Sequence, residues 1–235
     1  MYENVRPITI AQAQQEASTV FLAKVFNLMA LGLGITGVVA FLTANTGLAA
    51  AIIGSPLFIM LIFAELGLVF YLSARVEKIQ AATASGLFIG YSVLNGLTLS
   101  VIFLAYTSTS ITGTFFIAAG MFGAMAVYGL VTKRDLSGLG SFLFMGLVGI
   151  VIASIVNIFL NSSSVHWAIS FLGVLIFTGL TAYDVQKIKR IGEEGILAQG
   201  DEVVRKGTVM GALTLYLDFI NLFLMLLRFF GGSRD

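Results

Sequence analysis

Three long stretches without a charged side chain constrain the fold of this chain more than any other feature. Residues 25–64, 79–132 and 136–183 contain no Asp, Glu, Lys or Arg, and they are 40, 54 and 48 residues long. Each is about twice the roughly 20 residues that an α-helix needs to cross a bilayer. Because a helix satisfies its own backbone hydrogen bonds in lipid, each stretch is predicted to fold as a hairpin of two membrane-spanning helices.

Polar or glycine-containing breaks mark the predicted hinges, and a seventh apolar run follows near the end of the chain. The prediction is an all-α integral membrane protein, a seven-transmembrane-helix bundle of three hairpins around a central C-terminal helix. The transmembrane domain covers residues 20–231, with a cytoplasmic tail at 1–19 and a short tail at 232–235. The predicted spans are 20–43, 49–74, 82–106, 112–131, 139–160, 167–187 and 207–231.

The composition narrows the classes of function. Only 11% of the residues are charged, against about 25% in soluble domains. The net charge of +1 gives no reason to expect nucleic-acid binding, and the absence of cysteine excludes disulfides and thiolate metal sites. His166 is the single histidine, which rules out a multi-histidine metal site. No cofactor is expected.

The positions of lysine and arginine predict the orientation. The three predicted hinges contain none, and eleven of the thirteen basic residues lie on one side of the topology. The positive-inside rule makes that side, with the N-terminus, cytoplasmic. If residues 207–231 cross fully, the C-terminus with Arg234 lies outside; a re-entrant last helix is the alternative. The eleven are Arg6, Lys24, Arg75, Lys78, Lys133, Arg134, Lys187, Lys189, Arg190, Arg205 and Lys206.

Two aspartates lie within the predicted spans. Asp218 is eleven positions after Gly207 and ten before Arg228, where a charged carboxylate costs about 2.5–3.5 kcal/mol. Asp184 lies seventeen positions after Trp167, and a rise of about 1.5 Å per residue places both aspartates in the inner half. If they meet, they would share a proton, which predicts a pH-responsive latch. Ionised, they are also oxygen ligands suited to a transient Ca²⁺ ion.

Other polar residues in the spans admit more than one interpretation. Arg75, at the predicted inner rim, could hold one ionised aspartate in an open arrangement or could be a simple interfacial anchor. Glu65 could pair with Arg228 or lie level with Asp218, and depth alone does not decide. Lys187 and Lys189 are interpreted as inner-rim anchors, and packing hydrogen bonds rather than pore contacts are expected of Asn95, Asn157 and Asn221.

Three segments resemble the hallmark segments of the Bax inhibitor-1, or transmembrane Bax inhibitor motif, family. They are NGLTLS at 95–100, GLTAYDVQKI at 179–188 and LYLDFINLFLMLLR at 215–228. The resemblance implies a bundle of seven helices with a central last helix and a pH-sensitive calcium leak. It implies a sensor made of Asp184 and Asp218, a latch at Arg75, and an accessory charge pair of Glu65 and Arg228. The short polar N-terminus favours a bacterial inner-membrane protein, and a bundle of this size is expected to work as a monomer.

Three rival functions remain open at this point. Tyr183-Asp184 superficially fits an intramembrane aspartyl protease, but Leu217 precedes the second aspartate where such enzymes have a Gly-x-Gly-Asp turn. The protein is therefore not expected to be an enzyme. A proton-coupled secondary transporter would use the buried acids as a relay, although no inverted repeat is visible. A non-conducting regulator would bind another membrane protein, such as a quality-control protease.

Overall fold

The computed structural model describes residues 9–232, and within this range the fold is helical throughout, as predicted. Seven helical segments in it are long and apolar enough to cross a membrane. The long helices are α1 (Ile10–Asn45), α3 (Leu57–Arg75), α4 (Ala81–Leu99), α6 (Ser108–Val131), α7 (Ser137–Leu160), α8 (Ser163–Glu193) and α9 (Asp201–Phe230). Shorter elements are α2 (Leu48–Ile53), α5 (Ile102–Ala105) and the 3-10 turn η1 (Ile196–Ala198).

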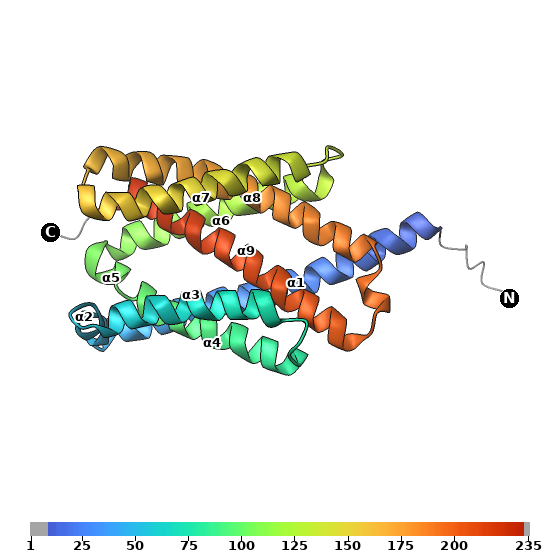
Figure 1. Ribbon diagram of the computed structural model, residues 1–235, viewed down its shortest axis with the longest axis horizontal. Helices are drawn as coiled ribbons and strands as arrows, with labels where there is room; N and C mark the ends of the chain where they lie inside the picture. Colours follow the sequence, from blue (N-terminus) through green and yellow to red (C-terminus); the bar gives the residue numbers. More distant parts are fainter. Residues whose placement is uncertain (1–8, 233–235) are drawn as a thin grey trace.

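Helix α9 runs through the middle of the bundle, where it packs against α1, α4, α6 and α8 (Figure 1). In its most apolar stretch 72% of the residues are buried, against 11–39% in the other spans, which confirms the predicted central helix. Its 30 residues extend about 45 Å. The backbone N–H of Thr107 donates to the carbonyl of Gly232 at 3.3 Å, so α9 ends beside the α5–α6 connection. The helix therefore runs the full length of the bundle, which favours a full crossing over a re-entrant last helix.

The first helix begins earlier than predicted. Thr9 caps α1 through a reciprocal pair of hydrogen bonds with Gln12, so residues 10–19 are helical and not an extended tail. This capping box satisfies backbone N–H groups that a helix start leaves without partners. Residues 1–8 and 233–235, with Arg6 and Arg234, lie outside the described part of the chain.

Two of the predicted spans are interrupted. The span at 49–74 consists of α2 and α3, separated at Gly54, Ser55 and Pro56. Proline has no backbone N–H and its ring clashes with the preceding turn, so a helix does not continue through it. The span at 82–106 ends as α4 at Leu99, where the Ser100 hydroxyl donates to the carbonyl of Leu97 at 2.6 Å.

Only one predicted hairpin is a closely packed helix pair. Helices α7 and α8 pack along each other, but the most extensive contacts of α1 are with α4, and α3 packs mainly on α4. A methyl group on Gly96 of α4 would lie 2.7 Å from Cβ of Val39 on α1. Small residues allow helices to approach this closely in membranes. This close approach selects α4, and not α3, as the neighbour of α1.

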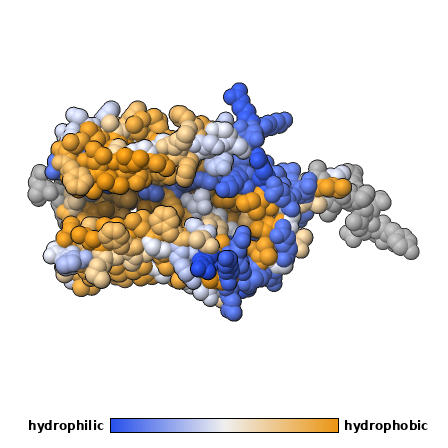
Figure 2. All heavy atoms as spheres, in the orientation of Figure 1, coloured by the Kyte–Doolittle hydropathy of each residue, from blue (hydrophilic) through white to orange (hydrophobic). Residues whose placement is uncertain are grey.

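Apolar side chains cover most of the length of the molecule, and hydrophilic ones gather at one end (Figure 2). That end carries the α3–α4, α6–α7 and α8–α9 connections, and most of the lysines and arginines lie in these connections or in the helix ends that adjoin them. The predicted segregation of basic residues is therefore present in the structure. The opposite end carries the connections without lysine or arginine and the C-terminus of α9.

Candidate functional site

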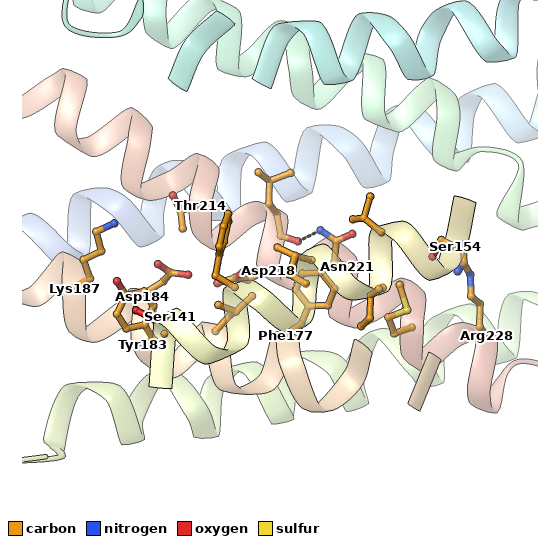
Figure 3. Close-up of a pocket in the computed structure, with 18 of the residues that line it drawn as sticks. Ser141, Ser154, Phe177, Tyr183, Asp184, Lys187, Thr214, Asp218, Asn221 and Arg228 are labelled. Atoms are coloured by element: carbon orange, nitrogen blue, oxygen red, sulfur yellow. Dashed lines mark hydrogen bonds between the residues drawn. The ribbon is translucent and has the colours of Figure 1, made fainter. Parts of the chain in front are cut away.

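Asp184 on α8 and Asp218 on α9 meet where these two helices pack together, as their depths along the helices predict. Their carboxyl groups lie within hydrogen-bonding reach of each other, and the two residues are only 9% and 5% exposed. Figure 3 shows the two side chains at one end of a cavity. The bundle thus buries two acids side by side.

No other donor reaches the Asp218 carboxyl group in the part of the chain that is described. Its Oδ2 atom is buried and receives no hydrogen bond from any N–H or hydroxyl group there. Two carboxylates so close together repel each other unless one of them carries a proton that bonds to the other. An acid pair in this arrangement can share one proton between α8 and α9.

The acid pair lies on the wall of a cavity of about 880 Å³ that extends between α7, α8 and α9. Arg228, ten residues further along α9, also lines it (Figure 3). The polar residues around the cavity include Ser141, Ser154, Tyr183, Lys187, Thr214 and Asn221. Asn221 donates to the carbonyl of Leu217 at 2.8 Å, which agrees with the packing role expected of it. The cavity links the two buried acids to the far end of the bundle.

The basic side chain nearest the pair is Lys187, not Arg75. Lys187 follows Asp184 by one helical turn, lines the cavity, and lies close enough for its charge to act on the Asp184 carboxyl group. Arg75 is exposed at the end of α3 and does not line the cavity. None of the ion pairs within residues 9–232 includes Arg75. The i, i+3 spacing on α8 is the sequence signal that could have singled out Lys187.

Glu65 and Arg228 are not paired in this structure. The Glu65 carboxylate accepts a hydrogen bond from the Thr98 hydroxyl and a second from Nδ2 of Asn95 at 3.4 Å. Both donors come from α4. Arg228 is exposed and forms no ion pair with the described acids. Glu65 therefore belongs to the α3–α4 interface, and its pairing with Arg228 stays a prediction for another arrangement.

Tyr216 is a buried polar residue that the sequence analysis did not single out. Its hydroxyl lies 2.6 Å from Oγ1 of Thr36 on α1, which also donates to the carbonyl of Ser92 on α4 at 2.8 Å. The Tyr216 ring packs edge-on against Tyr91 and Phe88. This cluster joins α9 to α1 and α4 on the side opposite Asp218, two residues away. Its only signal in sequence is a tyrosine inside an apolar span.

The structure offers two carboxylates for a metal ion at this site. No group of three or more His, Asp or Glu side chains suited to a metal occurs in the part of the chain that the structure covers. A resident Ca²⁺ takes six to eight oxygen ligands. Two aspartates supply only part of that ligand number.

These features define a helical membrane protein with a central last helix that shares a buried acid pair with the helix before it. A family model described as "Inhibitor of apoptosis-promoting Bax1" matches residues 18–235, so the chain belongs to the Bax inhibitor-1 family. The "Inner membrane protein YbhL" of Escherichia coli (strain K12) is 51% identical over 216 residues, which cover 91% of this chain and 92% of that protein.

Relatives from other bacteria match over a similar share of the chain. A protein of Borreliella burgdorferi is 49% identical over 232 residues, with 97% of this chain and 99% of the relative covered. A membrane protein of Streptococcus pyogenes serotype M1 is 40% identical over 217 residues, covering 91% and 93%. The chain and these relatives therefore match over nearly their whole lengths.

Proposed function

We propose that the protein is a pH-sensitive Ca²⁺ leak channel gated by Asp184 and Asp218. The observation that carries this proposal is the buried acid pair, which has no other donor for Asp218 and lies on a cavity between α7, α8 and α9. With one shared proton the pair holds α8 against α9. Loss of that proton places two like charges side by side in an apolar setting, which favours separation of the helices.

Separation of α8 and α9 would make the two ionised aspartates available as ligands for a metal ion. Two ionised aspartates beside a cavity with hydroxyl and amide groups would attract Ca²⁺ and replace part of its hydration shell. Arg75 acts as the latch in this proposal by pairing with one aspartate after the helices separate. Lys187 is the nearer base and the competing candidate for that role.

The proposed location is the bacterial inner membrane, with the N-terminus in the cytoplasm. The name of the Escherichia coli relative supports the location, and the basic connections at one end of the bundle support the orientation. We propose that the protein works as a monomer and is not an enzyme. Its partners are then the bilayer, protons, Ca²⁺ and, as a further candidate, a membrane protein such as a quality-control protease.

The test is Ca²⁺ flux into dye-loaded liposomes that contain only the purified protein, between about pH 5 and about pH 9. Flux of the parent should rise with pH, and the Asp184→Asn/Asp218→Asn variant should show no pH dependence. Glu65→Gln, which changes a carboxyl group outside the cavity, is the matched control and should keep the parent's profile. Arg75→Gln and Lys187→Gln identify the latch, because only its loss should lower flux at high pH.

Absence of flux at every pH from correctly inserted protein would exclude the channel. That result would favour the non-conducting regulator, and partner capture from membranes would follow. Flux that depends on an opposing proton gradient would instead favour a proton-coupled transporter.

A further inference from the structure

Helix α9 leaves one stripe of its surface uncovered in the middle of the bundle. Between positions 208 and 227 the partly exposed residues recur every three or four positions, and all others are buried. The stripe ends at the exposed Arg228. It lies where α9 makes few direct contacts with α3 and α7. The stripe residues are Met210, Thr214, Leu217, Asn221 and Leu224.

The middle of this stripe forms the floor of a groove that is open at the side of the bundle. Leu217 and Asn221 line the cavity described above, and α7 supplies an opposite wall that includes Val151, Ile155 and Ile158. These three α7 residues are 50%, 53% and 70% exposed, respectively. A hollow between two apolar masses is visible at this side of the molecule (Figure 2). In a membrane the groove therefore faces acyl chains.

A polar basin adjoins the groove at the end of the bundle away from the charged connections. This second cavity has a volume of about 490 Å³, and Arg228 lines both cavities. Trp167 and Phe229 form its aromatic side, with ring centroids 5.7 Å apart. Tryptophan at this position is typical of the membrane–water interface. The remaining lining residues are polar: Asn157, Asn161, Ser162, Ser163, His166 and Ser170.

Arg228 has no counter-charge among residues 9–232. No carboxylate among the described residues lies within ion-pair distance of it, and Glu65 is occupied by donors from α4. A guanidinium group binds phosphate through two parallel hydrogen bonds. The hydroxyl and amide groups around it supply further donors to an anionic oxygen. The basin therefore fits a phosphate ester.

The length of the groove fits one acyl chain. Arg228 and Asp218 are ten residues apart on α9, which is about 15 Å. One leaflet of a bilayer contributes about half of the roughly 30 Å hydrocarbon core. A chain whose phosphate lies at Arg228 would thus reach the level of the acid pair.

We infer that the groove between α7 and α9 is a binding site for one anionic glycerophospholipid, with its phosphate on Arg228 and one acyl chain along the α9 stripe. The alternating order of apolar groove, arginine and polar basin matches the amphipathic order of a lipid. A bound chain would fill the cavity beside Asp184 and Asp218. The inference stands independently of ion flux, because it rests on the groove and on Arg228.

Native mass spectrometry of the purified full-length protein tests the inference, with phosphatidylglycerol added at a few equivalents in detergent. The parent should retain one phosphatidylglycerol and retain phosphatidylcholine less well. Arg228→Gln should weaken retention at least about tenfold, the effect expected for a charged hydrogen-bonded partner. Arg205→Gln, which removes a charge at the opposite end of the bundle, is the control and should bind as the parent does.

Two further measurements test the contact of the headgroup and the contact of the acyl chain separately. Ile155→Trp should exclude the lipid by filling the groove, and its melting temperature shows whether the variant is folded. Trp167 is the only tryptophan of the parent, so phosphatidylglycerol with a headgroup spin label should quench the parent's fluorescence and not that of Arg228→Gln. Inorganic phosphate should not compete, since it has no chain for the groove.

Several outcomes would overturn the inference. Equal retention by the parent and Arg228→Gln would show that Arg228 does not hold the headgroup. Competition by inorganic phosphate would indicate a phosphate site without an acyl chain. If the parent without bound lipid forms dimers, and Ile155→Trp dissociates them, the groove would instead be an interface between two copies of the protein.

Discussion

Two places in this bundle hold carboxyl groups among apolar helices, and they are stabilised in opposite ways. At the α3–α4 interface Glu65 accepts hydrogen bonds from Thr98 and Asn95. At the α8–α9 interface Asp218 has only Asp184 within hydrogen-bonding reach in the described part of the chain. A carboxylate in a membrane needs donors or a counter-charge. Glu65 has donors, whereas each aspartate has the other aspartate beside it.

This difference is the reason for proposing the aspartate pair, and not Glu65, as the site that responds to pH. Donors that are already in place hold the Glu65 carboxylate in one arrangement and give no reason for α3 and α4 to separate. In the proposed mechanism the aspartate pair shares a proton that solvent can remove, and loss of that proton would convert an attraction into a repulsion. The cavity beside the pair would provide space for the movement that this proposal requires.

The largest effect is expected from closing the space in which α8 packs beside the acid pair. A side-chain carbon at Gly129 of α6 would collide with the backbone carbonyl of Ala182, two residues before Asp184. Gly129→Leu should therefore destabilise the protein by about 3 kcal/mol, measured as unfolding in detergent. Gly123→Leu on the same helix is the control, because no neighbouring atom lies within 4 Å of an added carbon there. Equal effects of the two variants would contradict the close α6–α8 contact.

The next effect distinguishes the two acidic sites directly. Unfolding stability of the parent should fall as pH rises through the range in which the shared proton is lost, with a slope of at most about 1.4 kcal/mol per pH unit. Asp218→Asn should remove this slope, and Glu65→Gln should keep it. Melting temperatures measured across a pH series test this comparison. If Asp218→Asn keeps the pH dependence of the parent, the aspartate pair is not the pH-responsive site.

A smaller effect is expected from removing a donor at the Glu65 site. Thr98→Val leaves one carboxylate oxygen without its hydroxyl partner and should destabilise the protein by about 1 kcal/mol. Thr178→Val is the matched control, because the buried Thr178 hydroxyl has no hydrogen-bond partner among the described residues. Chemical unfolding of both variants measures the difference. A larger loss at Thr178 would show that donors to Glu65 matter less than proposed.

The smallest effect concerns a third acidic site, Asp135 in the α6–α7 connection outside the membrane spans. The Ser137 hydroxyl, the Ser137 backbone N–H and the Arg190 guanidinium together lower the pKa of Asp135 to about 2. Because this pKa is below its ordinary value, the contribution to stability is present above about pH 4 and is lost as pH falls toward about 2. Asp135→Asn should slightly lower the melting temperature at neutral pH and leave the slope between pH 5 and 9 unchanged. A changed slope would assign part of the pH response to this loop.

The sequence alone determined the properties that depend on position along a helix. Length and charge-free stretches predicted seven spans, and the positions of lysine and arginine predicted the charged end. A constant rise per residue placed Asp184 and Asp218 at similar depths, and the structure brings their side chains together. These predictions succeed because depth in a membrane is set by distance along one helix.

Only the tertiary structure decided which helix faces lie together. It paired α1 with α4, gave Glu65 partners on α4 in place of Arg228, and brought Lys187 rather than Arg75 to the acid pair. It also left one face of α9 uncovered. In apolar spans nearly every face is hydrophobic, so periodicity does not reveal which face is buried. Close contacts such as Gly96 with Val39 and Gly129 with Ala182 fix the rotation of each helix about its own axis. These contacts exist only once the helices have packed.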